Sequence, residues 1–149
     1  MENAKKEAQI LEFWETEDEK ILSVQELKKQ NFTWALENLR GKSFFNKSIN
    51  QNIGVSRDGL GEWKTVTKTR DQAVSLKILG KMLENSIFWK EEQPKNNDPN
   101  IEKVIYFRQD CMINGQIYTA VITVKVYKSE NYHKYYHHYL DDFFLEPQK

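Results

Sequence analysis

Cysteine is almost missing from this chain of 149 residues, because Cys111 is the only one. A single cysteine cannot form an internal disulfide, and it rules out a zinc site made of several thiolates. No apolar run approaches the roughly 18 residues of a membrane-spanning helix. The first ten residues, MENAKKEAQI, lack the apolar stretch of a secretory signal. We therefore expect no membrane partner and a cytoplasmic site of action, with no route of export indicated.

Glycine is scarce as well, and its one cluster lies in SRDGLGEW, residues 56–63. This segment has neither the GxGxxG spacing of a dinucleotide-binding fold nor the GK[ST] ending of a P-loop. Cys111 falls inside an expected strand, where a lone cysteine is more often a small buried apolar residue than the nucleophile of a thiol hydrolase. The sequence therefore predicts no cofactor.

Acidic and basic residues are equally frequent, with 22 of each, but they are unevenly distributed. Residues 1–41 hold nine acidic and six basic side chains, a net charge of −3, and the rest of the chain carries the balancing +3. The basic excess falls mainly between Arg57 and Lys81, where six bases accompany three acids. This mild asymmetry permits an anionic partner for the second part of the chain without requiring one.

Residues 1–41 are expected to form an acidic arm that is helical from residue 3 onward. Its apolar residues recur at helical spacing, and Thr16 with Glu19 is a capping box that begins a second helix. A third short helix would end at Gly41, which accepts the left-handed conformation beyond a helix end. Two interpretations stay open: the arm is a brace packed on a domain formed by residues 42–149, or it is a connector within a longer protein.

The segment that follows the arm is polar, with short strands expected at residues 53–56 and 63–68. Thr69 and Gln72 then form another capping box, and the apolar residues after them keep helical spacing up to Glu84. We therefore expect one helix over this stretch, with its apolar stripe facing the core.

The strongest signal in the sequence is a β-hairpin. Residues 101–113 and 116–127 read as two long strands, and they flank Asn114 and Gly115, the dipeptide that most favours a two-residue turn. A last strand is expected at residues 135–140, antiparallel to its predecessor.

Together these elements predict an α+β fold, in which the helical arm precedes a helix packed on a three- to four-stranded antiparallel sheet. On the second long strand, one face is apolar and would meet the helix. The other face carries Thr123 and Lys125 and is half polar. We expect this polar face to be open to solvent or to a ligand.

All three histidines lie in NYHKYYHHYLDD, residues 131–142. Alternation along a strand sends His137 and His138 to opposite faces, so at most one of the pair can enter a given site. A zinc site would need a third ligand such as Asp141 or Asp142, and we do not expect a metal. The segment is either a solvated edge strand or the source of a catalytic acid or base, because histidine titrates near neutral pH.

RNA cleavage is the reaction that these residue types could perform together. A base would remove the 2′-hydroxyl proton, an acid would protonate the leaving 5′-oxygen, and cations would stabilise the phosphorane, so that no metal is required. Arg108, Lys125 and the basic cluster from Lys64 to Arg70 could supply the cations. Neighbouring tyrosines, Tyr136 among them, could stack unpaired bases.

Residues 53–140 resemble the phage-associated branch of the Barnase–EndoU–colicin–RelE-like nuclease superfamily. The resemblance rests on VSRDGLGEWKTVTK leading into LKILGKMLENSIFW, and on IEKVIYFRQDCMINGQIYTAVITVKVY leading into YYHHYL. It implies a metal-independent endoribonuclease that attacks through the 2′-hydroxyl and leaves a 2′,3′-cyclic phosphate. It also implies three kinds of partner: RNA, an antitoxin or immunity protein that neutralises a toxin, and the rest of a longer phage or mobile-element polypeptide.

The resemblance also places the functional residues. Relatives frequently carry a histidine after the glycine-containing turn, where this chain reads Glu62-Trp63-Lys64, and Glu62 could replace it as a base if its pKa were raised. The expected catalytic residues are His137, His138, Glu62 and Lys64. The expected substrate-binding residues are Thr65, Lys68, Arg70, Arg108, Thr123, Lys125 and Tyr136.

A second hypothesis belongs to a different class. The loss of that histidine and the net charge of zero favour a catalytically inactive module on the same fold, which would bind nucleic acid or a partner protein. Catalysis has a structural requirement that binding lacks. An imidazole near the carboxyl end must share one cavity with a cation from Lys64, Arg108 or Lys125, so that both reach one phosphate.

Overall fold

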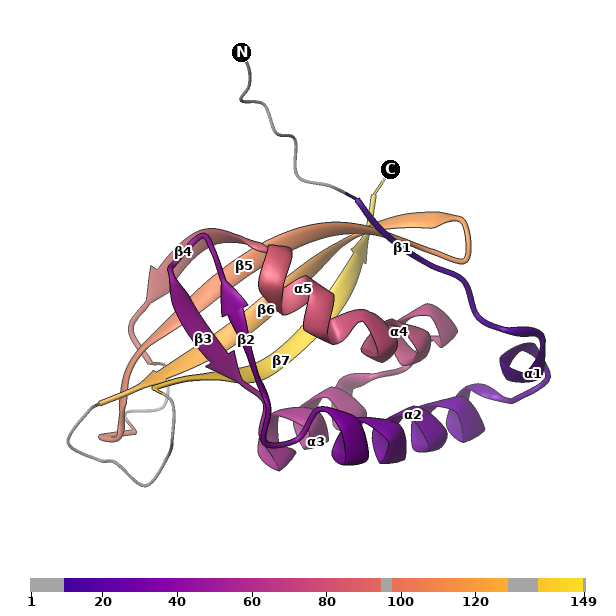
Figure 1. The fold of residues 1–149 in the computed structure, drawn as a ribbon, viewed down its shortest axis with the longest axis horizontal. Helices are drawn as coiled ribbons and strands as arrows, with labels where there is room; N and C mark the ends of the chain where they lie inside the picture. The colour runs from indigo at the N-terminus through magenta and orange to yellow at the C-terminus, as the bar shows by residue number, and fades with distance from the viewer. Residues whose placement is uncertain (1–9, 95–97, 129–136, 149) are drawn as a thin grey trace, which may run out of the picture.

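The structure is a computed structural model, and it describes residues 10–94, 98–128 and 137–148. Figure 1 shows a curled sheet behind helices α4 and α5, with α2 and α3 below them. The helices are α1 (Glu17–Lys20), α2 (Val24–Asn38), α3 (Arg57–Val66), α4 (Arg70–Ser75) and α5 (Leu79–Asn85), and a 3₁₀ turn, η1 (Leu76–Ile78), joins the last two. The strands are β1 (Leu11–Phe13), β2 (Ser43–Asn46), β3 (Gln51–Gly54), β4 (Ile87–Glu92), β5 (Ile101–Ile113), β6 (Gln116–Tyr127) and β7 (His138–Pro147).

The seven strands among the described residues form one mixed sheet that curls into a half-barrel. Their order is β1-β5-β6-β7-β3-β2, and β4 pairs with β5 beside β1. The pairs β1–β5 and β3–β7 are parallel, whereas the other pairs are antiparallel. The expected helix on a three- to four-stranded antiparallel sheet is therefore wrong. Strands β1, β2 and β3 have only three or four residues each, which is too few for alternation to reveal them.

Residues 63–68 were expected to be a strand, but helix α3 occupies most of this segment. The hydroxyl of Ser56 caps the helix by accepting a hydrogen bond from the Gly59 N–H at 3.3 Å. Leu60 and Trp63, spaced three residues apart on one helix face, are fully buried. Two glycines and a β-branched end lower the helix propensity of this sequence. The burial of Leu60 and Trp63 therefore stabilises α3 despite its low propensity.

The two clearest sequence signals are confirmed. Thr69 caps α4 by accepting a hydrogen bond from the Gln72 N–H at 3.2 Å, and helical structure continues with one 3₁₀ interruption to the end of α5. Strands β5 and β6 have the expected bounds. Asn114 and Gly115 between them both have positive φ, 51° and 85°, as this kind of hairpin turn requires.

The N-terminal segment packs on the rest of the protein through a helix and a strand. Helix α2 buries Leu27 and Ala35 in the same core that the sheet lines. The side-chain amide of buried Asn31 donates a hydrogen bond to a carbonyl of α4 at 2.9 Å. Residues 11–13, expected to be helical, instead form β1 and pair in parallel with the end of β5.

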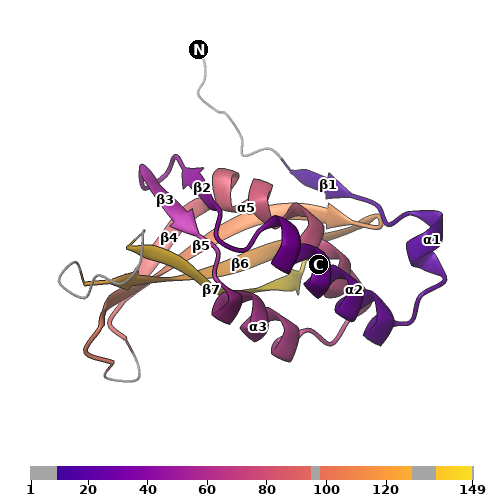
Figure 2. The ribbon, with the colours of Figure 1, turned by 60° about the horizontal axis from the view of Figure 1, so that its bottom comes forward.

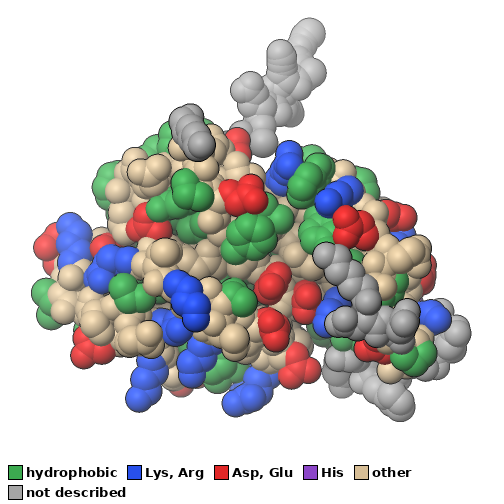
Figure 3. All heavy atoms as spheres, turned by 180° about the vertical axis from the view of Figure 1, so that it is seen from behind, with side chains coloured by type: hydrophobic (Ala, Val, Ile, Leu, Met, Phe, Trp, Pro, Cys, Tyr) green, Lys and Arg blue, Asp and Glu red, His purple; other side chains and the backbone are tan. Residues whose placement is uncertain are grey.

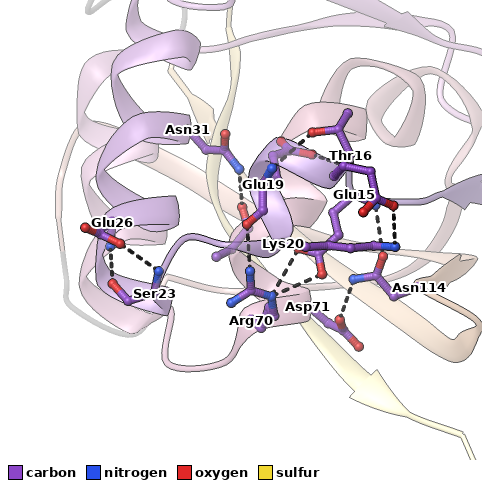
Figure 4. A network of polar contacts seen from close by, with 12 residues as sticks. Glu15, Thr16, Glu19, Lys20, Ser23, Glu26, Asn31, Arg70, Asp71 and Asn114 are labelled. Atoms are coloured by element: carbon purple, nitrogen blue, oxygen red, sulfur yellow. Dashed lines mark hydrogen bonds and ion pairs between the residues drawn. The ribbon is translucent and has the colours of Figure 1, made fainter.

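A polar network holds α1 against α4 (Figure 4). Nε of Arg70 donates to both carboxylate oxygens of Glu15 at 3.1 Å, and its Nη2 donates to the Glu19 carbonyl at 2.7 Å. The capping box of Thr16 and Glu19 is present at the start of α1, as the sequence predicts. Arg70 thus joins α4 to residues 15–19, which lie 51 to 55 positions earlier in the sequence.

Alternation along the long strands separates a core face from an open face. Ile105 and Phe107 of β5 are buried, whereas Tyr106 between them lies on the other side. Thr123 and Lys125 of β6 are partly exposed on that same side, as the sequence predicts. We call this side of β5, β6 and β7 the outer face, and Figure 3 views the molecule from the side opposite α4 and α5.

We predict that Gly59→Ala unfolds more easily than the wild-type protein. A Cβ atom on Gly59 would lie 2.3 Å from the backbone oxygen of Leu140 in β7, and a backbone atom cannot move aside as a flexible side chain can. We expect a loss of about 3 kcal/mol in the free energy of unfolding, measured by urea denaturation.

Gly61→Ala is the matched control for this prediction, because it lies on the same helix and its added Cβ would meet nothing within 4 Å. Alanine should raise stability there by about 0.5–1 kcal/mol, since glycine is a poor helix former. Equal stabilities of the two variants would contradict the close approach of α3 to β7.

Candidate functional site

Helix α3 and the outer face of the sheet enclose an open cavity of about 680 Å³, which we call the outer cavity. Helix α3 lies beside β7, as Figure 2 shows. Asp58, Glu62 and Thr65, spaced along one face of this helix, line one wall. The strands contribute Val104, Tyr106, Thr123, Lys125 and Asp141 to the other wall.

A β-bulge brings two adjacent carboxylates to the outer face. In the pairing of β6 with β7, Asp141 has no partner residue on β6. The extra residue of a bulge interrupts alternation, so neighbouring side chains can share a face. Asp141 lines the outer cavity and forms an ion pair with Lys125 at 3.2 Å. Asp142 next to it accepts a hydrogen bond from Thr123.

The surroundings of Asp142 raise the pKa of its carboxyl above the ordinary value. Burial is the largest cause, and the negative charges of Asp141 and Glu62 act in the same direction. The hydrogen bond from Thr123 and the charge of Lys125 oppose the shift without cancelling it. Figure 3 shows acidic side chains gathered near the middle of the molecule's rear view, with basic ones around them. Like charges crowded in this way favour a protonated carboxyl.

Two groups that line the outer cavity, Lys125 and Tyr106, have raised pKa values. Burial favours the neutral amine of Lys125, but the charge of Asp141 outweighs it and raises the lysine pKa. The pKa of the Tyr106 phenol is raised by burial first, and then by its hydrogen bond to Glu92. The Lys125 cation and the Tyr106 phenol can together hold a phosphate, and the Asp142 carboxyl of the adjoining pocket is the nearby group whose raised pKa suits proton exchange.

Four of the residues that the sequence nominates meet in the outer cavity: Glu62, Thr65, Thr123 and Lys125. They come from one helix and one strand about 60 positions apart in the sequence. Lys68 lies in a neighbouring pocket of about 240 Å³ that Asp142 also lines. The fold thus brings four of the nominated residues into one cavity.

The histidines lie elsewhere. His137 and His138 line a second cavity of about 360 Å³, together with Lys103 and other residues from β4, β5 and β6. Burial, followed by the positive charges of His137 and Lys103, lowers the pKa of His138. Catalysis by a histidine would need Lys64, Arg108 or Lys125 in the same cavity. None of these three residues lines the histidine cavity. The described residues therefore keep the imidazoles and those cations in separate cavities.

The remaining nominated residues have other surroundings. The Lys64 Nζ lies 4.7 Å from the centre of an aromatic ring on α2. Arg70 belongs to the network that holds the N-terminal segment (Figure 4). Arg108 stacks on Trp89 and does not line the outer cavity. Tyr136 lies outside the described residues.

Sequence reasoning missed the roles of Tyr106 and Asp142. The sequence suggests Asp141 and Asp142 only as possible zinc ligands, and it predicts a last strand that ends at residue 140. In the structure, β7 continues to Pro147. A longer last strand would have placed both carboxylates on the sheet. The alternation of β5 already places Tyr106 on the same face as Arg108, and this signal was available.

The comparisons with known proteins find a family but no close relative. Residues 23–139 match the family model described as "Large polyvalent protein-associated domain 3", a range that includes α3 and most of the outer-cavity wall but ends before Asp141. No curated protein and no solved structure matches.

Within the described ranges, no group of three or more histidine, cysteine, aspartate or glutamate residues could hold a metal ion. The helices of these ranges include none that is long and apolar enough to cross a membrane.

The raised pKa of Asp142 predicts how pH acts on stability. A carboxyl whose pKa is higher in the folded state favours folding while it is protonated, and this contribution is lost as the pH rises through the folded-state pKa. Asp142→Asn removes this titration. The variant should therefore gain stability relative to the wild-type protein when the pH is raised from 4 to 7. Urea denaturation across this range measures the difference, and a difference that stays constant with pH would contradict the raised pKa.

Proposed function

Because the chain belongs to the family Large polyvalent protein-associated domain 3, whose members are associated with polyvalent proteins of phages and mobile elements, we propose that it is an RNA-cleaving domain of such a protein. The observation that carries this proposal is the outer cavity, where Glu62 of α3 faces the Lys125–Asp141 ion pair of the sheet, while Asp142, a carboxyl of raised pKa, lines the adjoining pocket. An antitoxin or immunity protein as a further partner stays a prediction from the sequence.

The proposed reaction needs one base, one acid and one cation. Glu62 accepts the proton of the 2′-hydroxyl, and the 2′-oxygen attacks phosphorus. Asp142, whose pKa is raised above the ordinary value, acts as the acid and in its protonated form gives a proton to the 5′-oxygen as the bond between phosphorus and that oxygen breaks. Lys125 stabilises the charge that develops on the phosphorane. The products are a 2′,3′-cyclic phosphate and a free 5′-hydroxyl, and no step requires a metal.

A second candidate function, a catalytically inactive binding module, is favoured by a separate observation. His137 and His138 lie apart from the outer cavity, which is lined by four carboxylates and two cations: Asp58, Glu62, Asp98 and Asp141, with Arg57 and Lys125. Such a cluster repels phosphate unless at least one carboxyl is protonated.

We predict that the protein cuts single-stranded RNA in the presence of EDTA. Asp142→Asn and Lys125→Ala should each lower the cleavage rate by about 100-fold or more, because they remove the acid and the stabilising cation. Electrophoresis and mass spectrometry of the fragments measure the rate and identify the terminal 2′,3′-cyclic phosphate.

Asp18→Asn provides the matched control, since Asp18 is an exposed aspartate on α1. Its rate should equal that of the wild-type protein. Uncut RNA at high protein excess would contradict the nuclease proposal and favour the binding module. Loss of cleavage in His137→Ala, with full activity in Asp142→Asn, would move the reaction to the histidine cavity and contradict the outer cavity as its site.

A further inference from the structure

Trp89 lies on the outer face next to the outer cavity, and the pairing of β4 with β5 gives it no partner residue. Phe88 of β4 pairs with Phe107 and Lys90 pairs with Tyr106, so that Trp89 is the extra residue of a β-bulge. A bulge redirects a side chain. The bulge lets Trp89 share the outer face with its neighbour Lys90. The Trp89 indole lies beside the Tyr106 ring, with 6.4 Å between their centres, and Trp89 is 40% exposed.

Arg108 is held by this indole instead of by a carboxylate. Its guanidinium carbon lies 3.5 Å from the centre of the Trp89 ring, which is a stacking distance. Among the described residues, its guanidinium makes no hydrogen bond or ion pair, although Asp110 and Glu146 line the same shallow pocket. Stacking limits the motion of a guanidinium while leaving its N–H donors available, and such a group suits a phosphate.

The stacked pair is continuous with the outer cavity. Tyr106 lines that cavity and also contacts Trp89. Tyr106 and Arg108 are two residues apart on β5, so their side chains share a face at a spacing on the order of 7 Å. That spacing is comparable to the separation of neighbouring phosphates in an extended single strand. A second cation, Lys90, lies 4.5 Å from the Trp89 ring centre and 5.1 Å from that of Tyr106.

We propose that Trp89 and Arg108 form a nucleotide subsite beside the outer cavity, in which an unpaired base displaces the Lys90 ammonium from the Trp89 ring and stacks there, while Arg108 stays against the ring and binds the neighbouring phosphate. This inference rests on the proposed function, because it extends the same RNA strand by one nucleotide. Stacking on an exposed ring requires an unpaired base, so the substrate is single-stranded RNA rather than a duplex. The subsite is a binding site and takes no part in the proton transfers.

Binding of an uncleavable oligonucleotide tests the subsite without relying on catalysis. The probe is a fluorescein-labelled 2′-O-methyl hexauridylate, whose blocked 2′-oxygens cannot attack phosphorus, and fluorescence anisotropy measures its dissociation constant. Trp89→Ala should weaken binding about tenfold, and Trp89→Phe, which keeps an aromatic ring, should recover most of that loss. Circular dichroism verifies that both variants are folded.

The salt dependence of binding tests Arg108 separately. Arg108→Gln should reduce the slope of log K against log salt concentration by about 0.7, which corresponds to one lost contact with a single-strand phosphate. Trp14→Ala and Arg40→Gln are the matched controls, because both residues are exposed on other parts of the molecule, and neither should change the affinity or the slope.

Each outcome decides the subsite independently of cleavage. Tight binding that is unchanged in Trp89→Ala and Arg108→Gln would overturn the subsite, even if the wild-type protein cleaves RNA. No binding of the probe would overturn it as well, and the EDTA cleavage assay would then judge the proposed function on its own. Equal affinity for polyglutamate and for the probe, with no loss in Trp89→Ala, would indicate simple charge attraction and an acidic protein as the partner.

Discussion

The outer cavity depends on one close backbone contact between α3 and β7. Gly59 has no side chain, which lets the helix approach the carbonyl of Leu140 more closely than any other residue would allow. Leu60 and Trp63 on the buried side of the helix hold it in place. One turn from Gly59, Glu62 comes close enough to influence the pKa of Asp142. A helix held farther from the sheet would leave these carboxyls too far apart to act on the same phosphate.

Two β-bulges give the outer face its chemistry. The bulge in β7 places Asp141 and Asp142 together, so that one neutralises Lys125 and the other is driven toward its protonated form. The bulge in β4 lets Lys90 share the outer face with its neighbour Trp89, and both side chains contact Tyr106 of the outer cavity. In regular strands, one residue of each neighbouring pair, Asp141/Asp142 and Trp89/Lys90, would face the core. Bulges are common near functional sites for this reason, because they re-aim single side chains without changing the rest of the sheet.

The sequence predicts the parts of this fold that depend on local signals. The Asn114-Gly115 turn and the Thr69 cap each act over a few residues, and both are confirmed. The sheet as a whole was not predictable in the same way, because β1 and β3 are stabilised by distant partners in β5 and β7 rather than by their own short sequences. The site follows the same division. Alternation places Thr123 and Lys125 on the outer face, but a bulge leaves no mark in the sequence pattern, so Asp142 could not be assigned.

The central claim is that RNA binds in the outer cavity, between α3 and the sheet. Chemical-shift mapping tests it most directly: a ¹⁵N-labelled protein is titrated with an unlabelled 2′-O-methyl RNA hexamer, which it can bind but cannot cut. We expect the largest shifts at Glu62, Tyr106, Lys125 and Asp142, and unchanged signals around Arg70. Shifts confined to the cavity of His137 and His138, or no shifts at all, would contradict the account.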